Sequence, residues 1–281
     1  MISIIICSRK ADISQELKDN IAATIGCKYE LCVIDNSRNE YNIFTAYNEG
    51  VRRAKGDILC FMHEDVLFHT EGWGAVIANQ FTDKSIGVIG FAGAHFLPKA
   101  PMYWFSLPYI SQYNLQTGDN NELKNDTTAY FRGDLADVVA VDGFCFFMSS
   151  PLFERISFDE KNYHGFHAYD MDICMQVQKQ NMRVCVSRAI LVEHKWSENS
   201  LNNKKYMQLL DKYMHVFYGK WKDSLPVACG INEPEYVLNR LNNLCIQAHD
   251  AQMARSSNAY RLGRVLLAPI AYLKNTIIKR K

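Results

Sequence analysis

Short apolar runs alternate with amphipathic segments along the first part of the chain. Residues 2–7, Ile-Ser-Ile-Ile-Ile-Cys, form a β-branched run that predicts a strand covered on both faces of a parallel sheet. Residues 12–24 carry apolar side chains at helical spacing, and residues 30–34 form a second apolar run that ends at Asp35. This order predicts one β-α-β unit.

The same alternation continues toward residue 91. Residues 43–54 have helix-compatible spacing, and a Lys-Gly-Asp turn then leads into an apolar run over 58–62. A further helix is predicted over 73–81 and a strand over 86–91. Because ligands of such sheets bind outside the carboxyl ends of the strands, the residues that follow 58–62 are candidates for a binding site.

The second half of the chain is less regular. Residues 92–137 mix glycine, proline, aromatic and polar residues, which predicts long loops or an insertion over the ligand face of the sheet. Beyond it the pattern predicts a strand over 138–148, helices over 151–155 and 170–180, and short strands over 183–186 and 190–192. The elements together predict an α/β fold.

The character of the sequence changes after residue 196. Helices are predicted over 201–221 and 235–254, and residues 260–281 alternate basic with apolar side chains. Such a tail is typical of a helix on a membrane surface and equally of a packed helix. We expect one domain over 1–200 and a helical C-terminal extension over 201–281 with a basic amphipathic tail.

Composition and charge narrow the function classes. With 48% hydrophobic and 22% charged residues, the 281-residue chain is expected to build a sizeable core. A net charge of +1 argues against nucleic-acid binding. Nine cysteines without a C-x-x-C spacing argue against a zinc ribbon and suit a reducing cytosol. No secretory signal is recognised, so we expect a cytoplasmic protein, with peripheral contact to the inner face of the membrane through the tail as a further option.

Polar residues directly follow two of the predicted strands. The Asp-Asn-Ser sequence at 35–37 suits contacts with a base or ribose, although a simple turn explains it equally well. After the run over 58–62, backbone alternation points His63 and Asp65 to one side and Glu64 to the other. This pair predicts a site for Mg²⁺ or Mn²⁺, which would neutralise a diphosphate leaving group.

A series of short motifs occurs in a fixed order over residues 1–200. They are Ile2-Ser-Ile-Ile-Ile-Cys-Ser, Val33-Ile-Asp-Asn-Ser, Ala46-Tyr-Asn-Glu-Gly, Ala54-Lys-Gly-Asp, Phe61-Met-His-Glu-Asp-Val, Val141-Asp-Gly-Phe-Cys-Phe-Phe-Met, Phe158-Asp-Glu, Tyr169-Asp-Met-Asp-Ile-Cys and Val192-Glu-His. In this order they resemble the family 2 glycosyltransferases, and more narrowly the branch related to the streptomycin-biosynthesis glycosyltransferase-like proteins. The ordered set is far more specific than any one motif.

The resemblance implies a fold, a reaction and a cofactor. The fold would be of the GT-A type, a Rossmann-like mixed sheet with helices on both faces. The reaction would be inverting transfer of a sugar from a nucleotide-diphosphate donor, a UDP-sugar above others, to a hydroxyl of a saccharide or lipid-linked acceptor in surface polysaccharide synthesis. The cofactor would be a divalent metal, Mn²⁺ in preference to Mg²⁺.

The resemblance also implies roles for individual residues. Asp170 would be the general base that takes the proton from the acceptor hydroxyl. The metal would be bound by Asp65, with His194 and His63 as further ligands. The donor would contact Cys7, Ser8, Arg9, Asp35, Asn36, Asn48 and Glu64. The acceptor side would include Asp142, Gly143 and Asp172; capping of the helix is the alternative role for Asp172.

Two positions depart from the family pattern and leave alternatives open. His63 stands in place of the first acid of the Asp-x-Asp motif, and Tyr169 in place of the Glu often found before the catalytic Asp. An imidazole can ligate Mn²⁺ but disfavours Mg²⁺. One alternative is a non-catalytic nucleotide-sugar-binding protein. Another is a sugar nucleotidyltransferase, although the Gly-rich phosphate loop usual in that class is missing from residues 7–12.

Two further groups of residues have open interpretations. Aromatic residues crowd the segment 103–113, where they could stack on sugar rings or simply pack as core. His164 and His167 flank Gly165 ahead of the catalytic motif, in a loop that could close over substrate. For the two histidines, ordinary loop polarity is the favoured interpretation.

Overall fold

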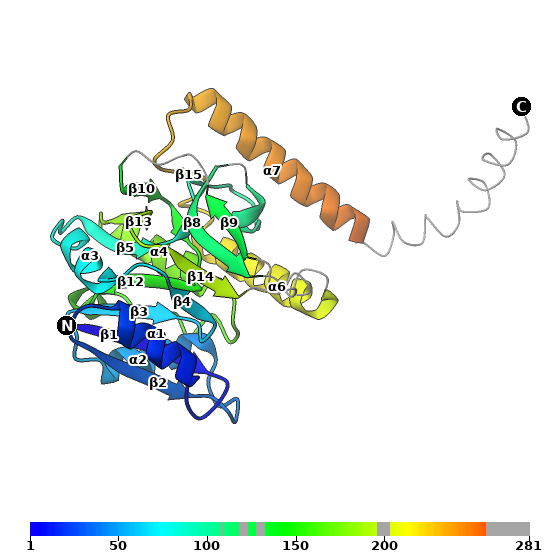
Figure 1. The fold of residues 1–281 in the computed structure, drawn as a ribbon. Helices are drawn as coiled ribbons and strands as arrows, with labels where there is room; N and C mark the ends of the chain where they lie inside the picture. The colour runs from blue at the N-terminus through cyan, green and yellow to red at the C-terminus, as the bar shows by residue number, and fades with distance from the viewer. Residues whose placement is uncertain (108, 118–122, 128–132, 196–202, 257–281) are drawn as a thin grey trace, which may run out of the picture.

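A seven-stranded sheet forms the centre of the protein in this computed structural model, which describes residues 1–107, 109–117, 123–127, 133–195 and 203–256. Its strands are β1 (Ile2–Ser8), β2 (Tyr29–Asp35), β3 (Ile58–Met62), β5 (Ile86–Gly90), β10 (Leu135–Val138), β12 (Cys145–Ser149) and β13 (Arg183–Ser187). They lie side by side in the order β10-β13-β5-β12-β3-β1-β2 (Figure 1). Because β12 runs antiparallel to both neighbours while β1 is parallel to β2 and β3, the sheet is mixed, as predicted.

Helices cover both faces of this sheet. They are α1 (Gln15–Thr24), α2 (Ile43–Arg53), α3 (Trp73–Gln80) and α4 (Tyr169–Lys179). In Figure 1, α1 and α3 lie on one face, and α2 and α4 on the other. Ser14 accepts a hydrogen bond from the N–H of Leu17, which sets the start of α1 later than residue 12, where the sequence pattern placed it. The predicted arrangement, including a β1 whose isoleucines are buried on both faces, is confirmed.

A second sheet replaces the long loops predicted over 92–137. Its strands are β4 (Val66–Phe68), β6 (Ala92–Ala94), β8 (Ile110–Thr117), β9 (Leu123–Thr127), β11 (Ala140–Val141) and β14 (Val192–Lys195), in the order β11-β6-β8-β14-β4, with β9 paired to β8. Of the two alternatives predicted over 92–137, the described residues agree with an insertion at the ligand face, and the long loops are wrong. One side of β8 presents polar side chains to a pocket, which removes the apolar alternation that marks a half-buried strand. A small ribbon of β7 (Phe96–Leu97) and β15 (Val227–Ala228) completes the strands described.

Two predicted strands have different bounds in the structure. The strand predicted over 138–148 is divided into β11 and β12, because the side chain of Asp142 accepts a hydrogen bond from the N–H of Phe144 and forms a turn between them. The strand predicted over 190–192 begins at Val192 instead. Two short 3-10 helices, η1 (Trp104–Ser106) and η2 (Ser150–Glu154), complete this part of the chain.

The C-terminal region contains α6 (Lys204–Trp221) and α7 (Glu235–Ser256). One face of α6 packs on the body through the buried residues Leu210, Tyr213, Met214, Phe217 and Trp221. Figure 1 shows α7 extending outward beside the domain. The predicted boundary at residue 200 stays a prediction, and the basic tail predicted to contact a membrane lies outside the described residues.

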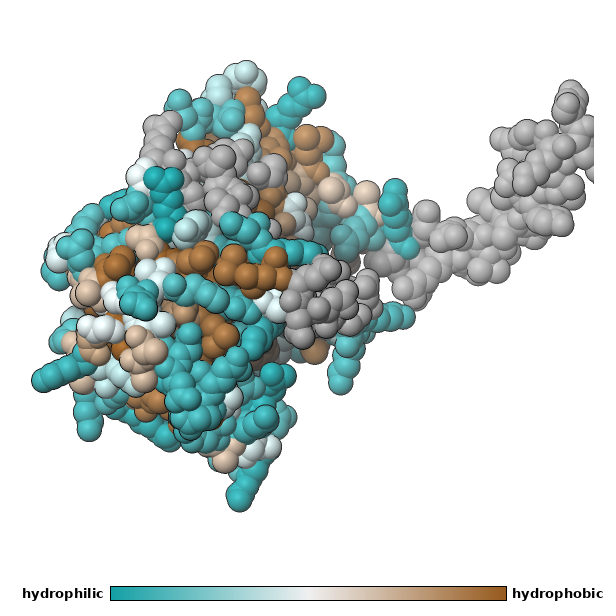
Figure 2. Space-filling view, viewed as in Figure 1, coloured by the Kyte–Doolittle hydropathy of each residue, from teal (hydrophilic) through white to brown (hydrophobic). Residues whose placement is uncertain are grey.

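The surface is largely polar on the face seen in Figure 2, where apolar residues gather in a few smaller groups. Within the part of the chain that the structure describes, no helix combines the length and apolar character needed to cross a bilayer.

Asp172 of α4 anchors α6 to the domain. Its side chain is 1% exposed and lies 2.8 Å from the ammonium group of Lys220. It also accepts hydrogen bonds from the indole N–H of Trp221, the hydroxyl of Tyr163 and the amide of Gln176. The contacts with Lys220 and Trp221 hold α6 against α4, and no side chain caps the start of α4, so the capping alternative is not observed. The prediction that Asp172 orients the acceptor stays a prediction.

We expect Asp172→Ala to lower the free energy of unfolding by about 3 kcal/mol, because a buried ion pair that loses one partner leaves the other uncompensated. Denaturant unfolding of the full chain measures this change. As a control, Asp223→Ala alters an exposed carboxylate just past the end of α6 and should change stability by no more than about 0.5 kcal/mol. Equal stability of the two variants would show that Asp172 does not anchor the helix.

Candidate functional site

One pocket of about 800 Å³ lies where the carboxyl ends of β1 and β3 face β8 and α6. The two strand ends contribute Cys7, Arg9 and the segment 63–65, and α6 contributes Tyr206, Leu210 and Met214. Its volume falls in the range of small-molecule and cofactor sites. The carboxyl edge of the sheet is the place where the sequence pattern predicted a ligand.

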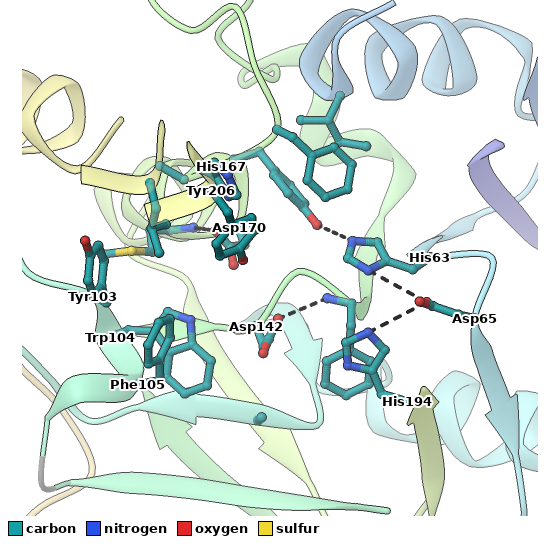
Figure 3. A pocket seen from close by; sticks show the side chains of 18 of the residues that line it. His63, Asp65, Tyr103, Trp104, Phe105, Asp142, His167, Asp170, His194 and Tyr206 are labelled. Carbon is teal, nitrogen blue, oxygen red and sulfur yellow. Dashed lines mark hydrogen bonds and ion pairs between the residues drawn. The ribbon is translucent and has the colours of Figure 1, made fainter. Parts of the chain in front are cut away.

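Three predicted metal ligands converge on one wall of this pocket (Figure 3). The carboxylate oxygen Oδ1 of Asp65 lies 4.0 Å from Nδ1 of His63 and 3.7 Å from Nε2 of His194. Each residue offers one ligand atom, and these atoms all lie within 4.8 Å of one another. The alternation predicted after β3 is confirmed, since Glu64 points away from this triad and binds Ser8 and Arg9 instead.

The hydroxyl of Tyr169 fixes the tautomer of His63. It lies 3.0 Å from the carbonyl of Gly143, to which it donates its single proton, and 2.8 Å from Nε2 of His63. Because that proton is already engaged, the ring of His63 must donate from Nε2. Its Nδ1 is then the unprotonated nitrogen, and it is Nδ1 that faces Asp65.

The residues of the triad fit a divalent cation. Oδ1 of Asp65 is a buried oxygen without a hydrogen-bond partner in the described structure, and burial raises the pKa of this carboxyl. Burial, together with His194 and Arg9, lowers the pKa of His63 to about 3, so its ring is neutral and able to ligate. Two imidazoles and one carboxylate suit Mn²⁺ better than Mg²⁺.

Two half-buried carboxyl groups, those of Asp142 and Asp170, line the same pocket. Burial and the charge of Asp142 raise the pKa of Asp170 to about 7. Asp170 accepts hydrogen bonds from the N–H groups of Gly143, at 3.0 Å, and Met171, at 2.8 Å. Burial also raises the pKa of Asp142, whose side chain lies between the triad and an aromatic cluster in Figure 3. The predicted residues Asp142, Gly143 and Asp170 thus form one unit.

Four of the seven predicted donor-binding residues lie at the pocket or directly behind it. Cys7, Arg9 and Glu64 line it, and the buried hydroxyl of Ser8 donates to Glu64 at 2.8 Å. The guanidinium of Arg9, whose side chain is 83% exposed, lies 2.7 Å from Glu64 at the rim. Burial raises the pKa of Cys7 to about 11, so Cys7 contributes a neutral thiol.

The other three predicted donor-binding residues lie outside this pocket. The exposed Asp35 accepts a hydrogen bond from the N–H two residues later, as in a simple turn. Asn36 exchanges two hydrogen bonds with the backbone of Tyr41. Asn48 pairs in the same way with the backbone of Phe158. Their side chains hydrogen-bond to nearby backbone, and the prediction that they contact the donor stays a prediction.

The pocket also contains residues whose interpretation the sequence left open, together with others that the sequence did not indicate, Tyr206 and the amide residues of β8. The favoured interpretation of His167 as an ordinary loop residue is wrong, because it lines the pocket and burial lowers its pKa to about 4. The ring of Tyr206 meets it edge to face at 4.9 Å. Tyr103, Trp104 and Phe105 form the aromatic wall that the sequence suggested. The amide side chains of β8 that line the pocket belong to no recognisable sequence motif, so the sequence alone did not indicate them.

We predict that Tyr169→Phe weakens Mn²⁺ binding about 10- to 100-fold, because the variant loses the hydroxyl that orients His63. Electron paramagnetic resonance of free Mn²⁺ in titrations of the protein measures the affinity. Tyr218→Phe, a matched change on α6, should bind Mn²⁺ as the wild type does. If Tyr169→Phe keeps the wild-type affinity, the triad is not the Mn²⁺ site or its geometry does not depend on Tyr169.

Comparisons with known proteins place the chain in a family. No curated protein sequence matches it at a significant level. The structure resembles GalNAc-T7 in complex with UDP, GalNAc and Mn²⁺, at 11% identity and a TM-score of 0.50, over 93% of this chain and 57% of that one. It also resembles TarS of S. aureus, at 13% identity and a TM-score of 0.50, over 91% of this chain and 73% of that one.

The chain therefore spans little more than half the length of GalNAc-T7. Both likenesses show the predicted GT-A fold. The narrower streptomycin-related branch stays a prediction. Residues 3–221 match the sequence profile of the glycosyltransferase-like family, and over most of its length the chain thus belongs to that family.

Proposed function

We propose that the protein is a metal-dependent glycosyltransferase that moves a sugar, with inversion, from a nucleoside diphosphate to a hydroxyl of a saccharide acceptor. The observation that carries the proposal is the half-buried carboxyl of Asp170, with a pKa of about 7, in the same pocket as the triad of His63, Asp65 and His194. A general base works best when its pKa lies near the working pH.

The donor is best assigned as a UDP-sugar. The fold is shared with GalNAc-T7, whose structure holds UDP and Mn²⁺, and the chain belongs to a glycosyltransferase family. A divalent cation held by His63, Asp65 and His194 would neutralise the charge that develops on the diphosphate. The exposed guanidinium of Arg9 is free to turn from Glu64 toward a phosphate oxygen at the same rim.

Asp170 takes the proton of the acceptor hydroxyl in this reaction. The N–H groups of Gly143 and Met171 each bind one of its carboxylate oxygens and so fix its orientation. As the proton moves to Asp170, the hydroxyl oxygen attacks the anomeric carbon from the face opposite the diphosphate. This displacement inverts the configuration at that carbon.

The rival interpretations have less support. A binding module gains nothing from placing the carboxyl of Asp170 in this pocket, because loss of hydration and the charge of Asp142 raise its pKa and so destabilise the folded protein at neutral pH. A nucleotidyltransferase would require the Gly-rich phosphate loop that residues 7–12 lack. A polysaccharide or lipid-linked acceptor, and contact with a membrane, stay predictions.

Asp170→Asn should keep UDP and Mn²⁺ affinity and lose turnover by at least about 100-fold, because the amide cannot accept the proton. Calorimetry measures UDP binding, and UDP release from a panel of UDP-sugars measures turnover. The raised pKa means that Asp170 costs stability once pH rises above the unfolded value of about 4, so the variant should also melt higher at pH 8. Wild-type turnover in Asp170→Asn would contradict the proposed role.

The pH dependence of turnover gives a separate test of the carboxyl pair. Turnover should rise with pH around a midpoint near 7, as Asp170 ionises. Asp142→Asn removes the neighbouring negative charge, so the midpoint should move to lower pH. The pH profile of kcat/KM for UDP release measures the midpoint in the wild type and in the variant. A midpoint that stays in place or moves upward in Asp142→Asn would exclude electrostatic coupling between the two residues.

A further inference from the structure

Strand β8 presents a row of amide side chains to the pocket. Gln112, Asn114 and Gln116 occupy alternate positions, so they point to one side of the strand, and all three line the pocket. The opposite side carries Ser111 and Leu115, which are buried in the protein. We call the three residues the amide strip; from Gln112 to Gln116 it spans about 13 Å.

The central residue of the amide strip has an unused acceptor. Asn114 is 1% exposed, and its Oδ1 is buried without a hydrogen-bond partner within the described residues. A buried carbonyl oxygen of this kind is costly for the folded protein unless a ligand satisfies it. Because a carbonyl oxygen only accepts hydrogen bonds, the missing partner is a donor such as a hydroxyl group.

The amide strip leads from the triad to the aromatic wall. Gln116 is paired in register with His194 on β14, and Gln112 with Ala92 on β6. The carbonyl of Ala92 accepts a hydrogen bond from the N–H of Asp142, so the far end of the strip lies near residue 142. In Figure 3, Tyr103, Trp104 and Phe105 gather on the side of Asp142 that is opposite the triad.

Apart from the carboxyl groups of Asp142 and Asp170, this path is lined by uncharged amides and aromatic rings, which suit a saccharide. The ring of Phe105 is 42% exposed and stacks on Tyr103 at 5.4 Å, so it presents a large apolar surface at the pocket. Amides and aromatic rings together match the hydroxyl groups and the apolar faces of sugars. The nearest lysine on β14, Lys195, lies 3.5 Å from Glu16, which already balances its charge.

We propose that the amide strip and the aromatic wall form the acceptor subsite, which binds a neutral oligosaccharide with Asn114 accepting a hydrogen bond from one of its hydroxyls. This assignment rests on the proposed function, because the triad and the diphosphate define which end belongs to the donor. Only Gln116 lies beside the triad, whereas Asn114 and Gln112 lead away from it.

The test separates saccharide binding from donor binding. Full-length wild-type protein with UDP and Mn²⁺ is applied to an array of neutral oligosaccharides, beside the variants Asn114→Leu and Asn79→Leu. Asn79 is an exposed residue of α3 outside the pocket, so it is a matched control for the same change. Calorimetry with UDP and Mn²⁺, and thermal melting, are measured for all three proteins.

We expect Asn114→Leu to bind neutral oligosaccharides at least about tenfold more weakly, with UDP affinity unchanged. Its melting temperature should equal or exceed that of the wild type, because the change removes a buried oxygen that lacks a partner. A merely structural asparagine would instead lower the melting temperature when replaced. Asn79→Leu should behave as the wild type in all three measurements.

Other outcomes overturn the assignment. If Asn114→Leu binds oligosaccharides as the wild type does, or loses UDP affinity equally, the amide strip is not an acceptor subsite. The same holds if the wild type binds UDP with Mn²⁺ but no neutral oligosaccharide, and in that case the proposed transfer reaction still stands. If the wild type fails to bind UDP at all, the proposed function fails with the inference.

Discussion

The hydroxyl of Tyr169 is the contact on which the arrangement of the site depends. From the first turn of α4 it contacts both the side chain of His63 and the carbonyl of Gly143, which lies between β11 and β12. The approach is close enough that a Cβ at residue 143 would lie 2.2 Å from this oxygen, so only glycine fits there. One side chain thus fixes the candidate metal ligand, the turn after β11 and the helix that carries Asp170.

The two acidic residues of helix α4, Asp170 and Asp172, have different roles, one in the pocket and one in the stability of the fold. Asp170 and Asp172 are two positions apart, which on an α-helix places their side chains on nearly opposite sides. Asp170 faces the pocket, where burial and Asp142 raise its pKa to about 7. Asp172 faces the other way and binds Lys220 and Trp221 of α6. Since Tyr206, Leu210 and Met214 of α6 line the pocket, this anchor also shapes the site.

The sequence predicted the site best where the spacing of residues along a strand determines which side chains lie together. The two-residue period of a strand predicted that His63 and Asp65 lie together after β3, and the resemblance carried by the ordered motifs predicted His194 as a further ligand. The structure brings all three together. Tyr169 was recognised only as a departure from the family pattern, because its role depends on contacts with residues 26 and 106 positions away. Nothing in the local sequence encodes such contacts.

What the sequence could not predict has physical causes of the same kind. Short polar residues such as Asp35, Asn36 and Asn48 bind backbone and bind ligands with the same atoms, so composition cannot separate the two uses. Strand β8 was read as loop because its amides face the pocket, where a strand facing the core would be apolar. For β8, the tertiary surroundings determine which side chains are polar.

The central claim is that the triad holds the metal to which a nucleoside diphosphate binds. Crystals grown with UDP and Mn²⁺, measured at the manganese absorption edge, test it most directly. The account predicts one anomalous peak within coordination distance of His63 Nδ1, Asp65 Oδ1 and His194 Nε2, with both phosphates of UDP on the same ion. Ordered UDP in this pocket with the manganese peak elsewhere, or with none, would contradict it.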